Sequence, residues 1–189
     1  MSLTLQSLLD QGCFLAGDEG LNKDVIAETL IPRVIYFTID SAASDPTRRG
    51  LVMVTSTVGL VNGNAALPTT ALVHHLQFAS VADPLDSTVA KKMRFANSWP
   101  EFIRPLDSTL GYFLAVQSSG ANQFYYTQPG TAYSPSSGYT GNITLTTPQI
   151  PTLPATASTA ITVNGEIEQD LVLNVAKAIK GDLWMKQGA

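Results

Sequence analysis

Charged side chains are scarce in this sequence of 189 residues, at 14% of the total, against roughly 25% in an ordinary globular domain. The cores of protein interfaces are depleted in Lys, Glu and Asp. Hydrophobic residues make up 44% of the chain, which is enough to bury a core and disfavours disorder throughout. The composition therefore favours a folded protein with many protein neighbours.

The sequence also lacks a basic cluster and a long apolar run. The net charge is −4, and the basic residues of the middle of the chain are scattered as Arg48-Arg49, Lys91-Lys92, Arg94 and Arg104. A nucleic-acid surface needs a basic stripe, so sequence-specific nucleic-acid binding is not expected. No apolar run approaches the roughly 20 residues that span a bilayer, and no signal peptide precedes Cys13. We expect a soluble protein, made in a cytoplasm, with no membrane partner.

Residue types that carry chemistry are few. His74 and His75 are the only histidines, and as neighbours on a predicted strand they point to opposite faces and do not readily share a metal ion. Cys13, the single cysteine, excludes an internal disulfide and is expected to be a small core residue. Paired carboxylates are possible only if folding brings together two of Asp83, Asp86, Glu101 and Asp107. We expect no catalytic residue, no metal ligand and no cofactor.

Asn62-Gly63 is the strongest local signal that is present. These residue types suit the two positive-φ positions of a type I′ turn. Before the turn, the apolar side chains of Val52, Val54, Val58 and Leu60 alternate with small or polar ones. We predict a hairpin, with a short return strand over 64–67 and a second strand over 72–81, divided by Pro68 because proline lacks an amide donor.

Three helices are predicted from apolar stripes and end signals. The first covers 2–17, with Ser2 or Thr4 as its N-cap and Gly17 as its stop. The second runs from Lys23 to about Asp40 and is kinked or split by Pro32, and a turn-rich link over 41–50 follows it. The third covers 164–181, with acidic residues in its first turn, lysines in its last and Gly181 at its end.

The remaining segments read as strands, turns and loops. Strands are predicted over 90–95, 112–116, 123–127 and 142–147, the middle two forming a second hairpin. A short helical turn is predicted over 97–104, an uncharged loop over 129–141 and an extended chain over 148–154. The fold class is therefore predicted to be α+β. One domain, 1–189, has a helical layer of 2–43 and 164–181, an inserted antiparallel hairpin or β-sandwich module over 50–163, and an extended tail over 182–189.

The arrangement resembles the head-to-tail connector, or adaptor, proteins of tailed bacteriophages. The motifs that carry the resemblance are the leading LTLQSLLDQ helix, the RRGLVMV entry into β-structure, WPEFIRPLD followed by LGYFLAV, the ITLTTPQIPTLPATA segment and the final helix EIEQDLVLNVAKAIKG. The likeness runs from about Thr4 to Gly181. It lies in the order of elements and in no catalytic motif.

The resemblance implies a non-enzymatic virion structural protein of the neck, assembled in the host cytoplasm. Its partners would be copies of itself in a ring of twelve, the portal protein on one side and a tail or nozzle protein on the other, with genome DNA passing through the ring. The apolar side chains Leu183, Trp184 and Met185 suit a tail that docks into another chain, because such anchors dominate interface energies. The alternative for this tail is that it folds back on its own domain.

Other functions remain open on sequence grounds. Within structural proteins, a minor capsid, decoration or tail-tube subunit is the alternative. From another class, a small-ligand or carbohydrate-binding β-module would use Tyr112, Tyr125 and Tyr126 as a stacking face. An enzyme that uses unrecognised carboxylates is the third alternative.

Overall fold

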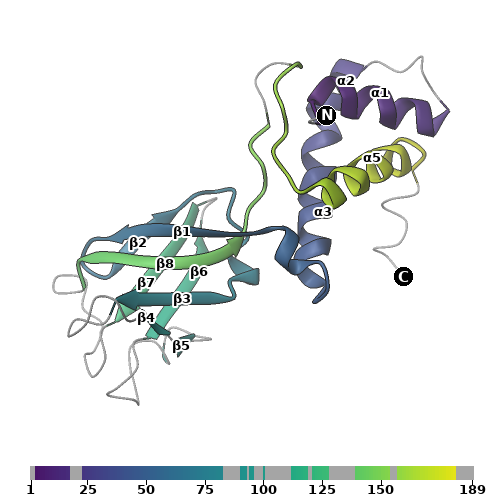
Figure 1. Ribbon diagram of the computed structural model, residues 1–189. Coiled ribbons are helices and arrows are strands. Elements are labelled where there is room, and N and C mark those ends of the chain that lie inside the picture. Colours follow the sequence, from purple (N-terminus) through teal and green to yellow (C-terminus); the bar gives the residue numbers. More distant parts are fainter. Residues whose placement is uncertain are drawn as a thin grey trace. The chain divides into compact units, whose positions relative to one another are not determined.

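The computed structural model describes residues 3–17, 23–82, 90–92, 94–95, 100, 112–118, 121–127, 139–153 and 157–181. The chain divides into two compact units (Figure 1). The helical unit comprises Met1–Val52 and Gln149–Ala189, and the β unit comprises Met53–Pro148. The predicted α+β class is confirmed: the N-terminal helices pack with the C-terminal helix, and the sheets are inserted between them in the sequence.

The first helix of the helical unit, α1, spans Leu5–Ala16 and has the predicted ends. Thr4 is its N-cap and forms a capping box with Ser7: the Thr4 hydroxyl accepts from the Ser7 amide at 3.1 Å, and the Ser7 hydroxyl accepts from the Thr4 amide at 2.8 Å. Gly17 ends the helix at φ 73°, a left-handed conformation that glycine adopts without steric cost.

Pro32 splits the second predicted helix. α2 spans Lys23–Thr29 and α3 spans Ile31–Ser44, so Pro32 lies in the first turn of α3, where no amide donor is needed. The prediction that the turn-rich link starts at residue 41 was wrong by a helical turn. Ala42 and Ala43 are buried, and this burial holds the extra turn in the helix. The short 3₁₀ helix η1, Arg49–Leu51, follows.

The last helix, α5, spans Gly165–Ile179. Asn164 caps it as predicted, its side-chain oxygen accepting from the Glu166 amide at 3.0 Å, and Gly181 follows at φ 77°. α5 also carries polar links to the neighbouring segments, since Asp170 pairs with Arg48. At both ends of α5, therefore, residues next to the helix determine where it starts and stops.

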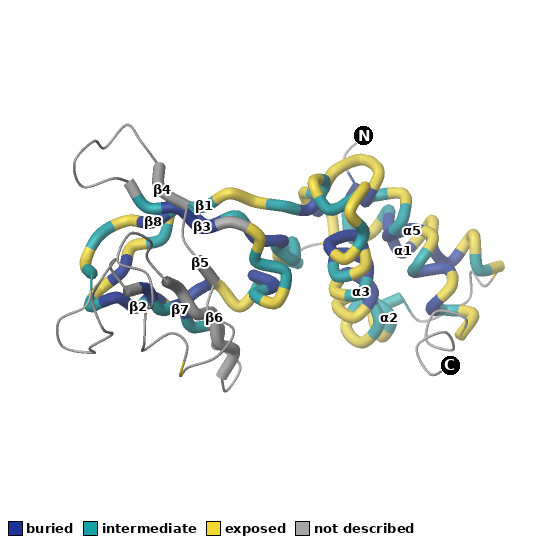
Figure 2. Tube along the Cα trace, turned by 90° about the horizontal axis from the view of Figure 1, so that it is seen from below, coloured by how far each residue is buried: buried dark blue, intermediate teal, exposed yellow. Residues whose placement is uncertain are grey.

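The core of the helical unit is built from buried faces of α1, α3 and α5 (Figure 2). Its fully or almost fully buried side chains include Leu8, Leu9, Cys13, Ile31, Val34, Ile35, Ile39, Ile167, Leu171 and Val175. One polar group is included: the buried Thr38 hydroxyl donates to the Val34 carbonyl at 2.7 Å and accepts from the Asn174 amide at 3.0 Å. The hydroxyl thus has a partner both as a donor and as an acceptor, which offsets the cost of burying it.

The β unit contains two four-stranded sheets. The first has the order β1 (Met53–Leu60), β8 (Gly141–Pro148), β3 (Phe78–Ala82) and β4 (Ala90–Lys92). The second has the order β2 (Asn64–Leu67), β7 (Ala121–Thr127), β6 (Tyr112–Ser118) and β5 (Arg94–Phe95). All these pairings are antiparallel except that of β5 with β6. Side chains from both sheets share one core, namely Leu60, Ala65, Leu67, Ala79, Phe124, Tyr126, Ile143 and Leu145.

The Asn62-Gly63 turn forms as predicted, but the hairpin does not. Both residues have positive φ, 49° and 74°, as a type I′ turn requires. Beyond a single bridge between Val61 and Asn64, however, the flanking strands part, β1 pairing with β8 and β2 with β7. The turn therefore passes the chain from one sheet to the other, and the shared apolar core holds the two strands apart.

Two predicted strands were also wrong in part. The segment predicted as a strand over 72–81 starts with the 3₁₀ helix η2, Val73–His75, and only Phe78–Ala82 is a strand. The segment over 90–95 is divided between β4 and β5, which lie in different sheets. The β6–β7 hairpin is confirmed, with Phe113 opposite Tyr126, and so is the strand at 142–147.

Three of the predicted segments lie wholly or largely outside the described residues. They are the helical turn at 97–104, the loop at 129–141 and the tail at 182–189. Within the described part of the chain, none of the helices has the length and apolar character that crossing a membrane demands.

Candidate functional site

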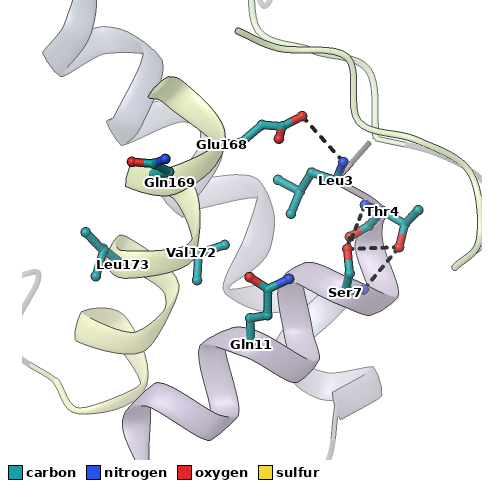
Figure 3. Close-up of a pocket in the computed structure, with 8 residues that line it drawn as sticks. All are labelled: Leu3, Thr4, Ser7, Gln11, Glu168, Gln169, Val172 and Leu173. Carbon is teal, nitrogen blue, oxygen red and sulfur yellow. Dashed lines mark hydrogen bonds between the residues drawn. The ribbon is translucent and has the colours of Figure 1, made fainter. Parts of the chain in front are cut away.

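A groove of about 760 Å³ lies between α1 and α5 in the helical unit (Figure 3). The two helices run in the same direction, since the Leu3 amide meets Glu168 at 3.4 Å near their starts and Gly12 lies against Val175 further along. The residues that line the groove come from both helices and from the chain before α1: Leu3, Thr4, Ser7, Gln11, Glu168, Gln169, Val172 and Leu173.

The chemistry of the groove suits binding. The Thr4 and Ser7 hydroxyls are engaged in the capping box, and Glu168 is the single carboxylate among the lining residues. The lining therefore holds neither a carboxylate pair nor a nucleophile beside a base, the arrangements that acid–base and covalent catalysis need. Val172 and Leu173 give one wall an apolar surface that a hydrophobic side chain could cover.

Apolar side chains continue the groove beyond its lining. On α1, Thr4, Ser7 and Gln11 recur every three or four residues, and the same stripe continues with Phe14 and Leu15. Phe14 is 67% exposed and Leu15 is 45% exposed, while Leu173 on the opposite wall is 49% exposed. We call Phe14 and Leu15, together with Leu173 of the lining, the apolar extension. Sequence reasoning missed it because the stripe changes from polar to apolar partway along α1.

The close approach of α1 and α5 depends on Gly12. A Cβ at Gly12 would clash with Val175, whose side chain is fully buried. We expect Gly12→Ala to destabilise the protein by up to about 2 kcal/mol, because overpacking costs about 1–3 kcal/mol and the better helix propensity of alanine returns about 1 kcal/mol. Equilibrium unfolding in urea measures this change.

The matched control is Gly165→Ala at the first position of α5. No atom lies within 4 Å of a Cβ there, so this variant should be neutral or slightly more stable than the unchanged protein. Equal stability of the two variants would show that the helices do not approach closely at Gly12.

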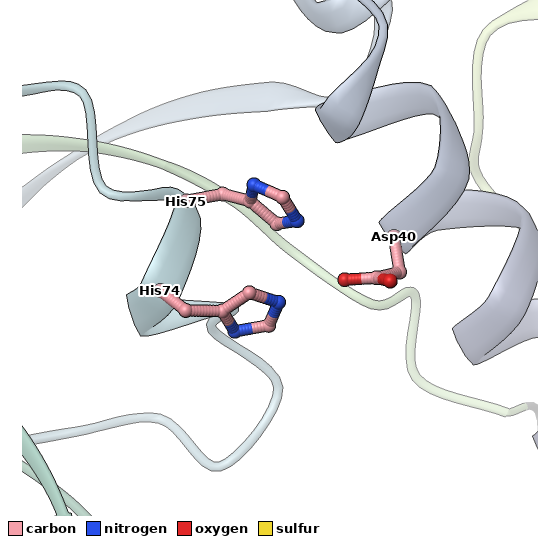
Figure 4. A group of neighbouring side chains, drawn as sticks. All are labelled: Asp40, His74 and His75. Atoms are coloured by element: carbon pink, nitrogen blue, oxygen red, sulfur yellow. The ribbon is translucent and has the colours of Figure 1, made fainter.

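The two histidines do not alternate across a strand as predicted. They belong to η2, and their ring centroids lie 4.2 Å apart with the planes tilted by 44° (Figure 4). Asp40, also drawn in Figure 4, belongs to α3 of the helical unit. The pair by itself offers fewer than the three protein ligands of a catalytic zinc site. Within each unit taken alone, the described residues contain no cluster of three or more His, Cys, Asp or Glu side chains that could hold a metal ion.

The remaining predicted residues divide between buried and undescribed ones. Cys13 is buried, as expected of a core residue. The carboxylates considered for catalysis, Asp83, Asp86, Glu101 and Asp107, lie outside the described residues. The docking residues Leu183, Trp184 and Met185 lie outside them as well, and their role stays a prediction.

The tyrosines do not form the proposed stacking face. Tyr126 is 2% exposed and belongs to the core of the β unit, where its ring meets Tyr139 edge-on at 5.2 Å between centroids. Tyr125, its neighbour on β7, is half-buried, and the side chain of Tyr112 is outside the described ones. A buried ring offers no face to a sugar, so at least one member of the predicted set is lost.

Burial gives Tyr126 a measurable signature. Desolvation, with a smaller contribution from Tyr139, raises the pKa of Tyr126 to about 12. Because the pKa in the folded protein is above that in the unfolded chain, the neutral side chain contributes its full stability below pH 10 and loses it as the pH rises towards 12. We expect Tyr126→Phe to make the alkaline fall in stability shallower, as measured by urea unfolding at several pH values. An equally steep fall in this variant would show that the pKa of Tyr126 is no higher in the folded protein than in the unfolded chain.

Comparisons with known proteins give no family. No protein-family model matches the chain, and no curated protein matches it significantly.

Proposed function

We propose that this protein is a structural subunit of a bacteriophage virion that forms a ring between the portal and the tail. The observation that carries the proposal is the order of the chain: helices from both ends form one packed unit, and the sheets are inserted between them. This is the arrangement on which the resemblance to head-to-tail connectors rests. Ring formation, portal binding and tail binding are its activities, and it has no reaction to perform.

The surface supports this proposal. A head-to-tail ring contact uses two different patches of each subunit, and exposed apolar side chains occur in both units. Val25 and Tyr36 in the helical unit are 53% and 46% exposed, and Val54 and Val61 in the β unit are 42% and 65% exposed. Together with the low content of charged residues, these side chains provide surface that neighbouring subunits can cover.

Mixing the purified protein with the portal protein of the same particle tests the proposal. We expect a complex that sediments with the portal and shows a ring of this protein on one end of it by electron microscopy. A decoration protein would instead bind preformed capsids that lack a neck. A ligand-binding module would remain monomeric, ignore portal particles and release or absorb heat with a sugar. Either of these last results would overturn the proposal.

The tail provides a sharper prediction. We expect deletion of Leu183 to Ala189 to weaken portal binding by at least about thirtyfold in Kd, since a single interface hot spot contributes about 2 kcal/mol or more. Circular dichroism should show that the shortened protein stays folded. Deletion of only Gln187 to Ala189 is the matched control, because it keeps the three apolar anchors, and should bind as the full chain does. Equal binding by both truncated proteins would remove the docking tail from the account.

A further inference from the structure

We propose that in the free subunit the groove between α1 and α5, with its apolar extension, binds Leu183, Trp184 and Met185 of the same chain. The contact concerns the subunit before assembly, whereas a portal contact by these residues concerns the particle. The tail would have to leave the groove before it docked elsewhere. This inference goes beyond the proposed function and stands or fails independently of it.

The first argument is the position of the apolar extension along the helices. α1 and α5 run in the same direction, and Gly12 lies level with Val175. Phe14 therefore lies further towards the end of α5 than Leu173 does, by about one turn. The extension leads from the groove to the place where α5 ends and the tail begins.

The second argument is the reach of the tail. Leu173 precedes Gly181 by eight residues, about 12 Å along a helix axis. Gly181 takes a left-handed conformation at φ 77°, which diverts the chain from the helix direction. Trp184 follows three residues later, a span of about 10 Å when extended. Its large side chain can thus reach Phe14 and Leu173 without any rearrangement of α5.

The third argument is chemical complementarity. The three tail residues are large and apolar. Leu173, which lines the groove, is 49% exposed, and Phe14, which continues the α1 stripe past it, is 67% exposed. Cover by an apolar segment would remove both sets of side chains from water.

The occupant is taken to be the tail of the same chain because of its tether. A short linker holds a segment near its site at an effective concentration on the order of millimolar. The tail of a second copy has this advantage only where the subunits are already assembled. Binding within one chain should therefore not depend on protein concentration.

Fluorescence of Trp184 tests the inference in the full chain. Trp99 is the other tryptophan, so the Trp184 signal is the difference between the unchanged protein and Trp184→Phe. We expect blue-shifted emission that acrylamide quenches poorly. Leu173→Ser and Phe14→Ser, each paired with its own Trp184→Phe version, should shift the emission to the red and raise quenching to the value for the denatured chain. Both positions are at least 49% exposed, and circular dichroism checks that the variants fold.

Val61→Ser is the matched control, since Val61 is an exposed apolar residue of the β unit. It should leave the Trp184 signal unchanged. Three results would overturn the inference: quenching of Trp184 in the unchanged protein as strong as in the denatured chain, the same protection in the groove variants as in the control, or protection that disappears on dilution. The last would place the tail on a second copy.

Discussion

Leu171→Ala is expected to destabilise the helical unit by about 2–5 kcal/mol, the range for truncating a fully buried leucine. Leu171 is 0% exposed and belongs to the face of α5 that also buries Ile167 and Val175. Truncation of its side chain leaves a cavity in the core, where α5 from the end of the chain packs on the N-terminal helices. Calorimetry or urea unfolding monitored by circular dichroism measures the loss.

Val25→Ala is the control for this variant. Val25 is 53% exposed on α2, and an exposed truncation should change stability by no more than about 0.5 kcal/mol. Were Leu171→Ala as mild as this control, α5 would not be part of the core that α1 and α3 form.

Phe124→Ala is expected to destabilise the β unit by about 3–5 kcal/mol. Phe124 is 0% exposed and lies among core side chains contributed by both sheets. Since each unit has its own core, Phe124→Ala and Leu171→Ala should lower different unfolding transitions in calorimetry. Val54→Ala, exposed on β1 of the same unit, should leave both transitions in place. A single transition lowered equally by both core variants would mean that the two units unfold as one.

The helices could be predicted because their signals are local. Thr4, Asn164 and Gly181 act on groups within one turn of themselves, so the sequence near each of them is sufficient to locate the helix ends. The split at Pro32 follows from a single ring. The error at Ser44 arose because burial of Ala42 and Ala43, a tertiary effect, extended α3 past its local stop.

For the sheets, the sequence predicts where strands lie but not which strands pair, because paired strands are far apart along the chain. Asn62-Gly63 determines a turn, but β1 pairs with β8, more than 80 residues away along the chain. The period of two at 72–81 fits one face of a strand, yet His74 and His75 belong to the 3₁₀ helix η2, which the sequence pattern does not indicate. For the same reason the two imidazole rings came together where opposite faces were expected.

The candidate site was the least predictable feature. The groove needs lining side chains from α1 and α5 that are more than 150 residues apart in the sequence, and no single stretch encodes both of its walls. Its polar lining, Thr4 and Ser7, reads locally as a helix cap and nothing more. Phe14 and Leu15 were visible in the sequence, but only the packing of α1 shows that they stay exposed.

Cryo-electron microscopy of intact particles shows whether this protein belongs to the neck of a virion. With an antibody against the purified protein as a label, we expect bound label at the neck and a closed ring, into which this fold fits, between the portal and the tail. Label on the outer surface of the head, or along the tail tube, would contradict it.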